Sequence, residues 1–137
     1  MSTSAPLDVV NDYFQALAQG RVAEAMALLS PDVVWHQPGA NRFSGDHTGP
    51  EQVGALIGAM MEASGGTFAV TPQGQAMGNG ELVAVPVRFS GRRQGPQESH
   101  SLDQAGVDLL TVREGRIVEV HLFSQDGPAE DEFWDRA

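Results

Sequence analysis

The chain has 137 residues, of which 41 % are apolar, and it contains no cysteine. This length suits a single domain with its own core, and we expect one domain over residues 1–137. Without cysteine the chain can form no disulfide, thiolate metal site or cysteine nucleophile. Its 18 acidic and 8 basic residues give a formal net charge of −10, which argues against nucleic acid as a partner.

The sequence contains no apolar run near the roughly 18 residues that a membrane span requires. Its first residues lack the basic and apolar regions of a signal peptide. We therefore expect a cytoplasmic protein that has no membrane partner.

Three segments in the first half of the chain have helical periodicity. The first lies between Pro6, which suits a first turn, and Gly20, which suits a C-terminal stop, with Ser4 as the expected N-cap. Its apolar residues at positions 10, 13, 14 and 17 share one face. The same spacing predicts a short helix over residues 22–29 and a third over residues 50–61.

Strands are predicted between and after these helices. A short strand over residues 33–37 is followed by a loop over residues 38–49. Four further strands are expected over residues 68–76, 82–90, 104–113 and 116–124. Pro86 lies inside one of them, which requires an edge position or a bulge.

Helices followed by consecutive strands are typical of an α+β domain. We expect three N-terminal helices packed on a strongly bent, mostly antiparallel sheet, in a cone-shaped arrangement that leaves a cavity. The acidic tail over residues 125–137 ends in Phe133 and Trp134. These two aromatic side chains are expected to pack on the body of the domain or on a partner.

Four segments in this order resemble the NTF2-like superfamily, in particular its SnoaL-like and ketosteroid-isomerase-like branch of polyketide cyclases. They are YFQALAQG at 13–20, ALLSPDVVWH at 27–36, GDHTGPEQV at 45–53 and VREGRIVE at 112–119. The resemblance covers most of the chain. It implies a small-molecule pocket, and it favours a homodimer formed through the sheet. Apolar residues on both faces of the strand over residues 116–124 favour the same dimer.

The resemblance also assigns roles to particular residues. Ketosteroid isomerases carry an oxyanion-donating tyrosine in the first helix, where this chain has Tyr13. They carry a protonated aspartate on the penultimate strand, where this chain has Asp108. Their general base is an aspartate before a proline, and here Gln37 stands at that position; an amide cannot take the proton. The base would then be His36, a water held by Gln37, or the substrate itself.

A related branch, the limonene-epoxide-hydrolase-like proteins, has an arginine two residues before this aspartate. Here that position is Gly106, which argues against their water-activating array.

Each of these assignments has a plainer alternative. Asp108 lies in an apolar run and shares a face with Leu110; if that face is buried, the pKa of the carboxyl should rise, whereas the opposite face would leave it in water. Arg88 on a neighbouring strand could instead pair with Asp108 and hold it ionised. Tyr13 could be an ordinary core tyrosine with its hydroxyl at the edge of the core.

The four histidines, at positions 36, 47, 100 and 121, lack the spacing of a metal site, and we expect neither a metal nor a cofactor. His47 and His100 are expected at the surface. On a regular strand His36 and Gln37 point to opposite faces, so His36 could act as a base only if a bulge re-aimed it.

We expect the substrate to contact Leu17, Trp35, Met60, Leu110 and His121. The pattern favours a small isomerase-like or cyclase-like enzyme that stabilises an enolate of an apolar carbonyl compound. The alternative is a non-catalytic module that binds a hydrophobic small molecule. A third interpretation is a protein-interaction domain that uses the outer sheet face and the aromatic tail.

Overall fold

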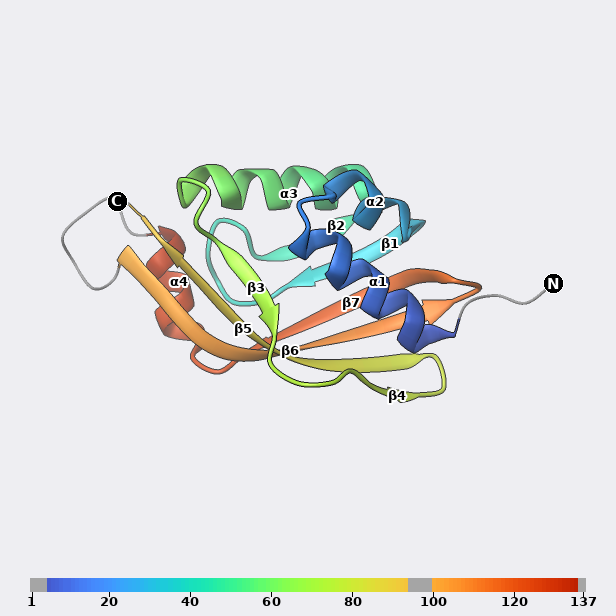
Figure 1. Cartoon of the computed structure of the whole chain (residues 1–137). Helices are drawn as coiled ribbons and strands as arrows, with labels where there is room; N and C mark the ends of the chain where they lie inside the picture. The colour runs from blue at the N-terminus through green and yellow to red at the C-terminus, as the bar shows by residue number, and fades with distance from the viewer. Residues whose placement is uncertain (1–4, 94–99, 136–137) are drawn as a thin grey trace.

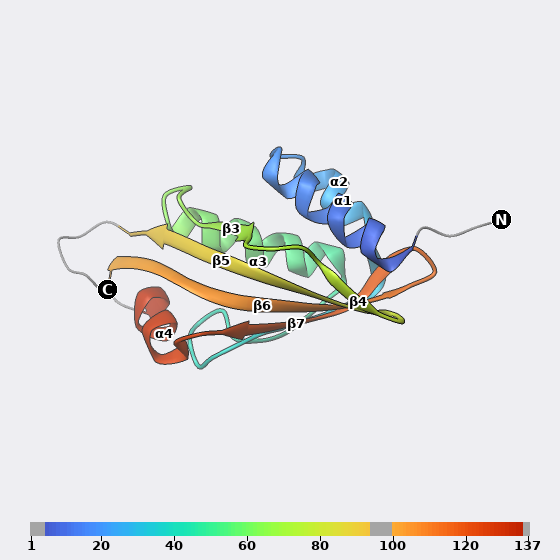
Figure 2. The ribbon, with the colours of Figure 1, turned by 60° about the horizontal axis from the view of Figure 1, so that its bottom comes forward.

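A computed structural model describes residues 5–93 and 100–135, so the predicted N-cap Ser4 lies outside the described residues. Within these ranges the chain forms a seven-stranded sheet and four helices, in an α+β arrangement that confirms the predicted class. Helices α1 (Pro6–Ala18), α2 (Val22–Ala27) and α3 (Gly49–Ala63) lie over one face of the sheet (Figure 1). Figure 2 shows α4 (Gly127–Asp135) apart from them, at one end of the sheet.

The strand order is β2-β1-β7-β6-β5-β3, with β4 also paired to β5. Strands β1 and β7 run parallel, and the other pairs are antiparallel. The strands are β1 (Leu29–Gln37), β2 (Gly45–Thr48), β3 (Ala69–Pro72), β4 (Met77–Asn79), β5 (Leu82–Arg92), β6 (Ser101–Arg113) and β7 (Arg116–Ser124). The prediction for β7 is confirmed residue for residue, whereas β2 lies in the segment predicted as loop.

Pro86 corrects a prediction about the sheet. Strand β5 is neither an edge strand nor bulged at Pro86, because it pairs with β6 without interruption on one side and with β3 and β4 on the other. The pairing with β3 stops at Val87 and that with β4 stops at Ala84. Pro86 therefore lies between the two partners, where its missing N–H removes no ladder hydrogen bond.

The core lies between the helices and the sheet. It contains the α1 face predicted from periodicity, including Val10 and Tyr13, and the alternate residues of β5 and β6 that face it. We call this helix-covered side of the sheet the inner face and the other side the outer face. None of the helices in the described ranges combines the length and the hydropathy needed to cross a bilayer.

The C-terminal segment folds onto the body of the domain as α4. Phe133 and Trp134 are buried, and Trp134 packs edge-to-face on Phe43 and Phe68 at centroid distances of 5.1 and 5.2 Å. The carboxylate of Asp131 accepts hydrogen bonds from the Ala40 backbone and the Asn41 amide. The tail is therefore part of the core, as the first of the two predicted alternatives held.

Candidate functional site

Strand β1 separates the predicted site residues onto two faces. Trp35 and Gln37 are buried on the inner face, at 8 and 6 % exposure. His36 lies between them on a regular strand and points to the outer face, since successive side chains alternate. No bulge re-aims it, so His36 does not reach the inner face as a base.

Gln37 is partly occupied by its neighbour. The indole N–H of Trp35 donates a hydrogen bond to Oε1 of Gln37 at 3.0 Å. This bond fixes which end of the amide is the acceptor, and it leaves the N–H groups of Gln37 as donors. Gln37 can therefore hold a ligand oxygen or a water, but it has no basic atom to offer.

Tyr13 comes from α1, which packs over β5 and β6. Its side chain is 2 % exposed, and its hydroxyl has no hydrogen-bond partner among the described residues. Burial, together with the nearby negative charge of Asp108, raises the pKa of Tyr13 above its ordinary value. The hydroxyl is thus protonated at neutral pH, and among the described residues it is an uncommitted donor.

Asp108 lies on the inner face of β6, in line with Leu110, and not on the wet face. Burial raises the pKa of its carboxyl from 3.8 to about 7. The residue as a whole keeps some solvent exposure. A carboxyl in this state carries a proton about half the time at neutral pH and can then donate a hydrogen bond.

No cation among the described residues neutralises Asp108. The guanidinium of Arg88 pairs with Asp103 instead, at 2.7 Å from Nε to Oδ1, on the exposed side of β5 and β6. The proposed pairing of Arg88 with Asp108 is therefore wrong. With no basic partner, the cause of the high pKa of Asp108 is burial alone.

The sheet register sets the spacing of the inner groups. Asp108 on β6 lies opposite Leu122 on β7, and β1, which carries Gln37, is the next strand. Two strand spacings separate Asp108 from Gln37, a distance of about 10 Å. Leu122 is half-buried between them. Leu122 therefore has a polar group on either side of it along the inner face.

The apolar residues predicted to contact substrate belong to the same core. Met60 and Leu110 are 5 and 1 % exposed, and Leu17 on α1 packs against the core that contains them. The cavity that they were expected to line remains a prediction. An open groove of about 350 Å³ lies elsewhere, between α1 and α2, where mostly polar side chains such as Asp12, Gln15 and Arg21 line it.

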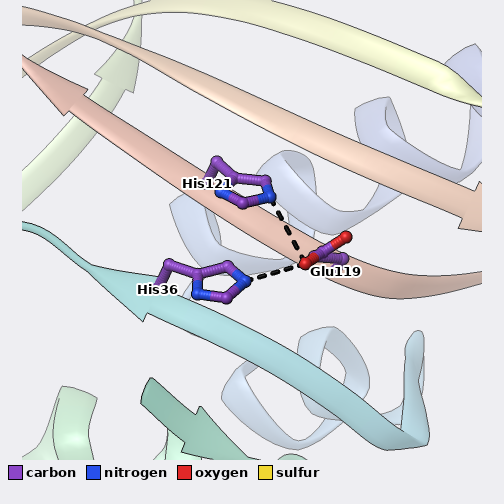
Figure 3. Close-up of side chains that lie close together, drawn as sticks. All are labelled: His36, Glu119 and His121. Carbon is purple, nitrogen blue, oxygen red and sulfur yellow. Dashed lines mark hydrogen bonds and ion pairs between the residues drawn. The ribbon is translucent and has the colours of Figure 1, made fainter. Parts of the chain in front are cut away.

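The outer face holds a second group of ionisable residues. His36, Glu119 and His121 come from β1 and β7, and their side chains converge (Figure 3). Oε2 of Glu119 lies 2.8 Å from Nε2 of His36 and 3.3 Å from Nε2 of His121. His121 was expected in the substrate pocket; the structure places it with His36, on the face opposite Tyr13 and Asp108.

Hydrogen bonds, not burial, shift the pKa values of this outer cluster. The bond to Glu119 is the main cause that raises the pKa of His36, and Asp46 adds to it through a 2.7 Å contact with Nδ1. The reciprocal contact lowers the pKa of Glu119. The two imidazole rings stack at 4.2 Å between centroids with an interplanar angle of 11°.

The other two histidines take separate positions. His47 is half-buried, and its Nε2 lies 2.9 Å from the carbonyl oxygen of Phe43. His100 is 7 % exposed, so its expected surface position is wrong. Neither belongs to the group formed by His36, Glu119 and His121.

Sequence reasoning missed Glu119 and Asp46. A usable signal was present for Glu119, because residues two apart on a strand share a face and Glu119 stands two before His121. No spacing could show that His36 and Asp46 join them, because that depends on β1 lying between β2 and β7.

Gly106 explains why the arginine of the epoxide-hydrolase-like proteins has no counterpart. A Cβ at this position would lie 2.5 Å from the carbonyl oxygen of Phe123 and 2.9 Å from Cε1 of Phe89. Both distances are shorter than real carbon contacts, so the ring of Phe89 occupies the space that a side chain would need. The packing therefore excludes an arginine beside Asp108.

Comparison with known proteins gives concordant results. A family model described as SnoaL-like domain matches residues 10–120. An uncharacterised protein of Mycobacterium tuberculosis is 35 % identical, over 98 % of this chain and 99 % of the relative. A protein of unknown function with a cystatin-like fold from Xanthomonas campestris is 45 % identical, with a TM-score of 0.88, over 97 % of this chain and 100 % of that one. An NTF2-like protein from Burkholderia xenovorans shares the fold at 22 % identity, with a TM-score of 0.75, over 98 and 99 % of the two chains.

Proposed function

Because the chain belongs to the SnoaL-like family of NTF2-like domains, we propose that it binds an apolar carbonyl compound against the inner face and stabilises its enolate. The observation that carries this proposal is the pair formed by Tyr13 and Asp108. Within the described part of the chain, one is a buried hydroxyl without a hydrogen-bond partner, and the other is a carboxyl without a neighbouring cation. Both are unfavourable for the apo fold, and both are relieved by a ligand oxygen that accepts two hydrogen bonds.

The two groups suit an oxygen that gains negative charge. When the proton α to a carbonyl leaves, charge moves onto the carbonyl oxygen, where the Tyr13 hydroxyl and the protonated Asp108 carboxyl would both donate. Donors fixed in a weakly polar interior stabilise such charge strongly, by about 2–4 kcal/mol for each donor. Asp108 can donate only while protonated, so this stabilisation should decline as the pH rises through about 7.

The proposed chemistry also needs a group that accepts the proton from the substrate. Gln37 cannot take a proton, and His36 lies on the outer face. The acceptor would be a water held by the free amide N–H of Gln37, or a basic group of the substrate itself.

The lack of a base favours a second candidate function. The same inner face could bind a hydrophobic molecule that carries one oxygen and perform no chemistry on it. Catalysis and binding differ in what they require of Asp108, and this difference can be tested.

The test measures the affinity of substituted phenols of graded acidity for the wild-type chain and for D108N and D108L, by titration of tryptophan fluorescence. Phenolates mimic the charge of an enolate oxygen. If Asp108 is a neutral donor, D108N keeps most of the affinity, since an amide still donates, and D108L loses about 2–4 kcal/mol. D103N, which changes an exposed carboxylate on the same strand, is the matched control.

Two other outcomes would contradict the proposal. Equal loss of affinity in D108N and D108L would mean that Asp108 acts as an ionised group. Tighter binding in D108L would indicate the binding module, because a polar group would then have left an apolar site. If D108N keeps the affinity and D108L loses it, a second measurement separates an enzyme from a binding module. An enzyme would exchange the α-hydrogens of simple ketones in heavy water, and a binding module would not.

We also propose that the outer face joins two copies of the chain. Val107 and Phe123 lie opposite each other on β6 and β7 and are 39 and 55 % exposed, and Pro86 on β5 continues their row. A stable interface buries at least about 1,000 Å². Sedimentation should show a particle of twice the chain mass of 14.6 kDa, and F123D should dissociate it. A monomer at high concentration would exclude this dimer.

A further inference from the structure

The three converging side chains of the outer face carry a second proposal, independent of the inner face. One ring nitrogen each of His36 and His121 and a carboxylate oxygen of Glu119 all lie within 4.8 Å of one another (Figure 3). We propose that they bind one divalent transition-metal ion of the Zn²⁺ class. Such a site would be a property of the sheet's outer surface and would take no part in the proposed enolate chemistry.

The donor set selects the class of metal. Two imidazole nitrogens and one carboxylate oxygen are the ligands that Zn²⁺, Co²⁺ and Ni²⁺ accept, whereas Mg²⁺ and Ca²⁺ prefer oxygen alone. Three protein ligands leave at least one coordination position for water or another molecule. The side chains of His36, Glu119 and His121 are 30, 41 and 41 % exposed in the single chain, where an ion can enter directly from solvent.

The sheet holds the ligands at fixed places. His36 on β1 is paired in register with His121 on β7, and Glu119 lies two residues earlier on the same strand. Both strands are interior to the sheet, with β2 beyond β1 and β6 beyond β7. The backbone therefore fixes where each side chain begins, which lowers the entropy lost on binding an ion.

Asp46 supports the site from outside the ligand set. Its carboxylate lies 2.7 Å from Nδ1 of His36, which directs Nε2 of the same ring toward Glu119. A carboxylate that orients a ligating histidine in this way is a common feature of metal sites and makes the imidazole a better ligand. The His36 ring faces a carboxylate at each nitrogen, Asp46 at Nδ1 and Glu119 at Nε2. A neutral ring carries only one N–H, so both contacts are favourable only when His36 is protonated or when Nε2 binds a metal.

Metal binding would therefore exchange a proton for the ion. In the metal-free protein a proton at Nε2 of His36 bridges to Glu119, and an incoming M²⁺ takes the place of that proton, which is released to solvent. The stacked rings must turn about χ2 for their lone pairs to meet at one ion. That torsion is broad, and both rings are partly exposed.

The charged groups that face the cluster favour a cation. Glu119 and Asp46 supply two carboxylates, and within the described ranges these two residues form ion pairs only with His36 and His121. On β6, the neighbouring residues are Leu109 opposite His121 and Thr111 opposite Glu119, which add no charge.

The experiment titrates the untagged full chain with Zn²⁺ by calorimetry at pH 7.5 and uses Co²⁺ absorption to report coordination. We expect one ion per chain. H36N and H121N should each lower the affinity by more than the roughly 10–100-fold that a supporting residue controls, and D46N should fall within that range. E119Q should abolish the visible Co²⁺ bands, and the affinity should drop as the pH falls and His36 takes up its proton.

H47N is the matched control, because His47 lies outside the cluster and should leave the affinity unchanged. Circular dichroism verifies that each variant is folded, which the partial exposure of the side chains favours. If the cluster variants and H47N bind alike, or if Co²⁺ binds without visible bands, the ion is held only by the general negative charge of the chain and the proposal fails.

Discussion

The inner and outer faces of one sheet treat ionisable side chains in opposite ways. On the inner face Asp108 and Tyr13 are removed from water and receive no compensating bond from the described residues. Burial raises the pKa of both, and the negative charge of Asp108 adds to the shift of Tyr13. On the outer face His36, Glu119 and His121 stay partly in water and bond to one another. A shifted pKa therefore has different causes on the two faces. On the inner face it reflects loss of hydration that no bond replaces, and on the outer face it reflects hydrogen bonds between the ionisable groups.

The two faces contribute to the stability of the fold with opposite signs. Bonds between the outer groups stabilise the fold in the protonation states in which they form, whereas the inner carboxyl destabilises it whenever ionisation is favoured in water. Buried polar groups that destabilise the fold are typical of binding sites, where a bound ligand provides the hydrogen bonds that the protein itself does not. The comparison thus points to the inner face for the carbonyl ligand.

The largest expected effect concerns Asp108 and pH. The unfolded chain ionises this carboxyl from about pH 4, whereas the folded chain keeps its proton up to about pH 7, so its contribution to stability is lost as the pH rises between these values. The free energy of unfolding should fall by about 4 kcal/mol more in wild type than in D108N over this interval. Urea unfolding at pH 4 to 8 measures it. Parallel curves for the two proteins would mean that Asp108 is ionised in the folded state over this whole pH range.

Gly106→Ala tests how tightly the inner face is filled. The added Cβ would meet the Phe123 carbonyl and the Phe89 ring, so the free energy of unfolding should fall by about 2–3 kcal/mol. Gly58→Ala in α3, where a Cβ meets nothing within 4 Å, should instead raise it by about 0.5–1 kcal/mol. Similar midpoints for both variants in urea would show that the sheet near Asp108 is loosely packed.

Tyr13→Phe removes a buried hydroxyl that has no partner among the described residues. The free energy of unfolding should stay the same or rise by about 1 kcal/mol, because a polar group leaves an apolar place. The affinity for phenols should fall in the same variant. Thermal and urea unfolding check the first statement, and a loss of stability above 1 kcal/mol would indicate that the hydroxyl has a partner in solution.

Glu119→Gln gives the smallest effect, on the outer face. The folded state raises the pKa of His36, so the stabilisation is present below about pH 6.5 and is lost as the pH rises through the folded value. Because the side chains are partly exposed, we expect a loss of only about 0.5–1 kcal/mol at pH 6 and almost none at pH 9. Unfolding in urea at both pH values measures this, and salt should reduce the difference. A pH-independent loss would point to packing instead of charge.

Local patterns in the sequence were enough for the fold class, the helix faces and strand β7, because periodicity depends only on neighbours along the chain. They also placed Tyr13 and Asp108 on the inner side. The aromatic tail offered no periodicity long enough to predict α4, whose stability comes from Phe43 and Phe68 far away in sequence. The outer cluster and the partner of Arg88 depend on which strands are neighbours, and that order is a tertiary property.

The parallel pairing of β1 with β7 has a consequence for the order of events on the ribosome. His36 and Glu119 are separated by 83 positions, so β1, the first of the seven strands to be synthesised, can pair with β7 only after β7, the last, has been made. Closing so long a loop is entropically unfavourable until other contacts have brought its ends together. The hairpin of β5 and β6 needs no such closure, because its two strands are close in sequence. The contact of α1 with β6 closes a loop that is as long as the one between β1 and β7. Both faces therefore depend on long-range closure, and the hairpin of β5 and β6 is a part of the sheet that can form before it.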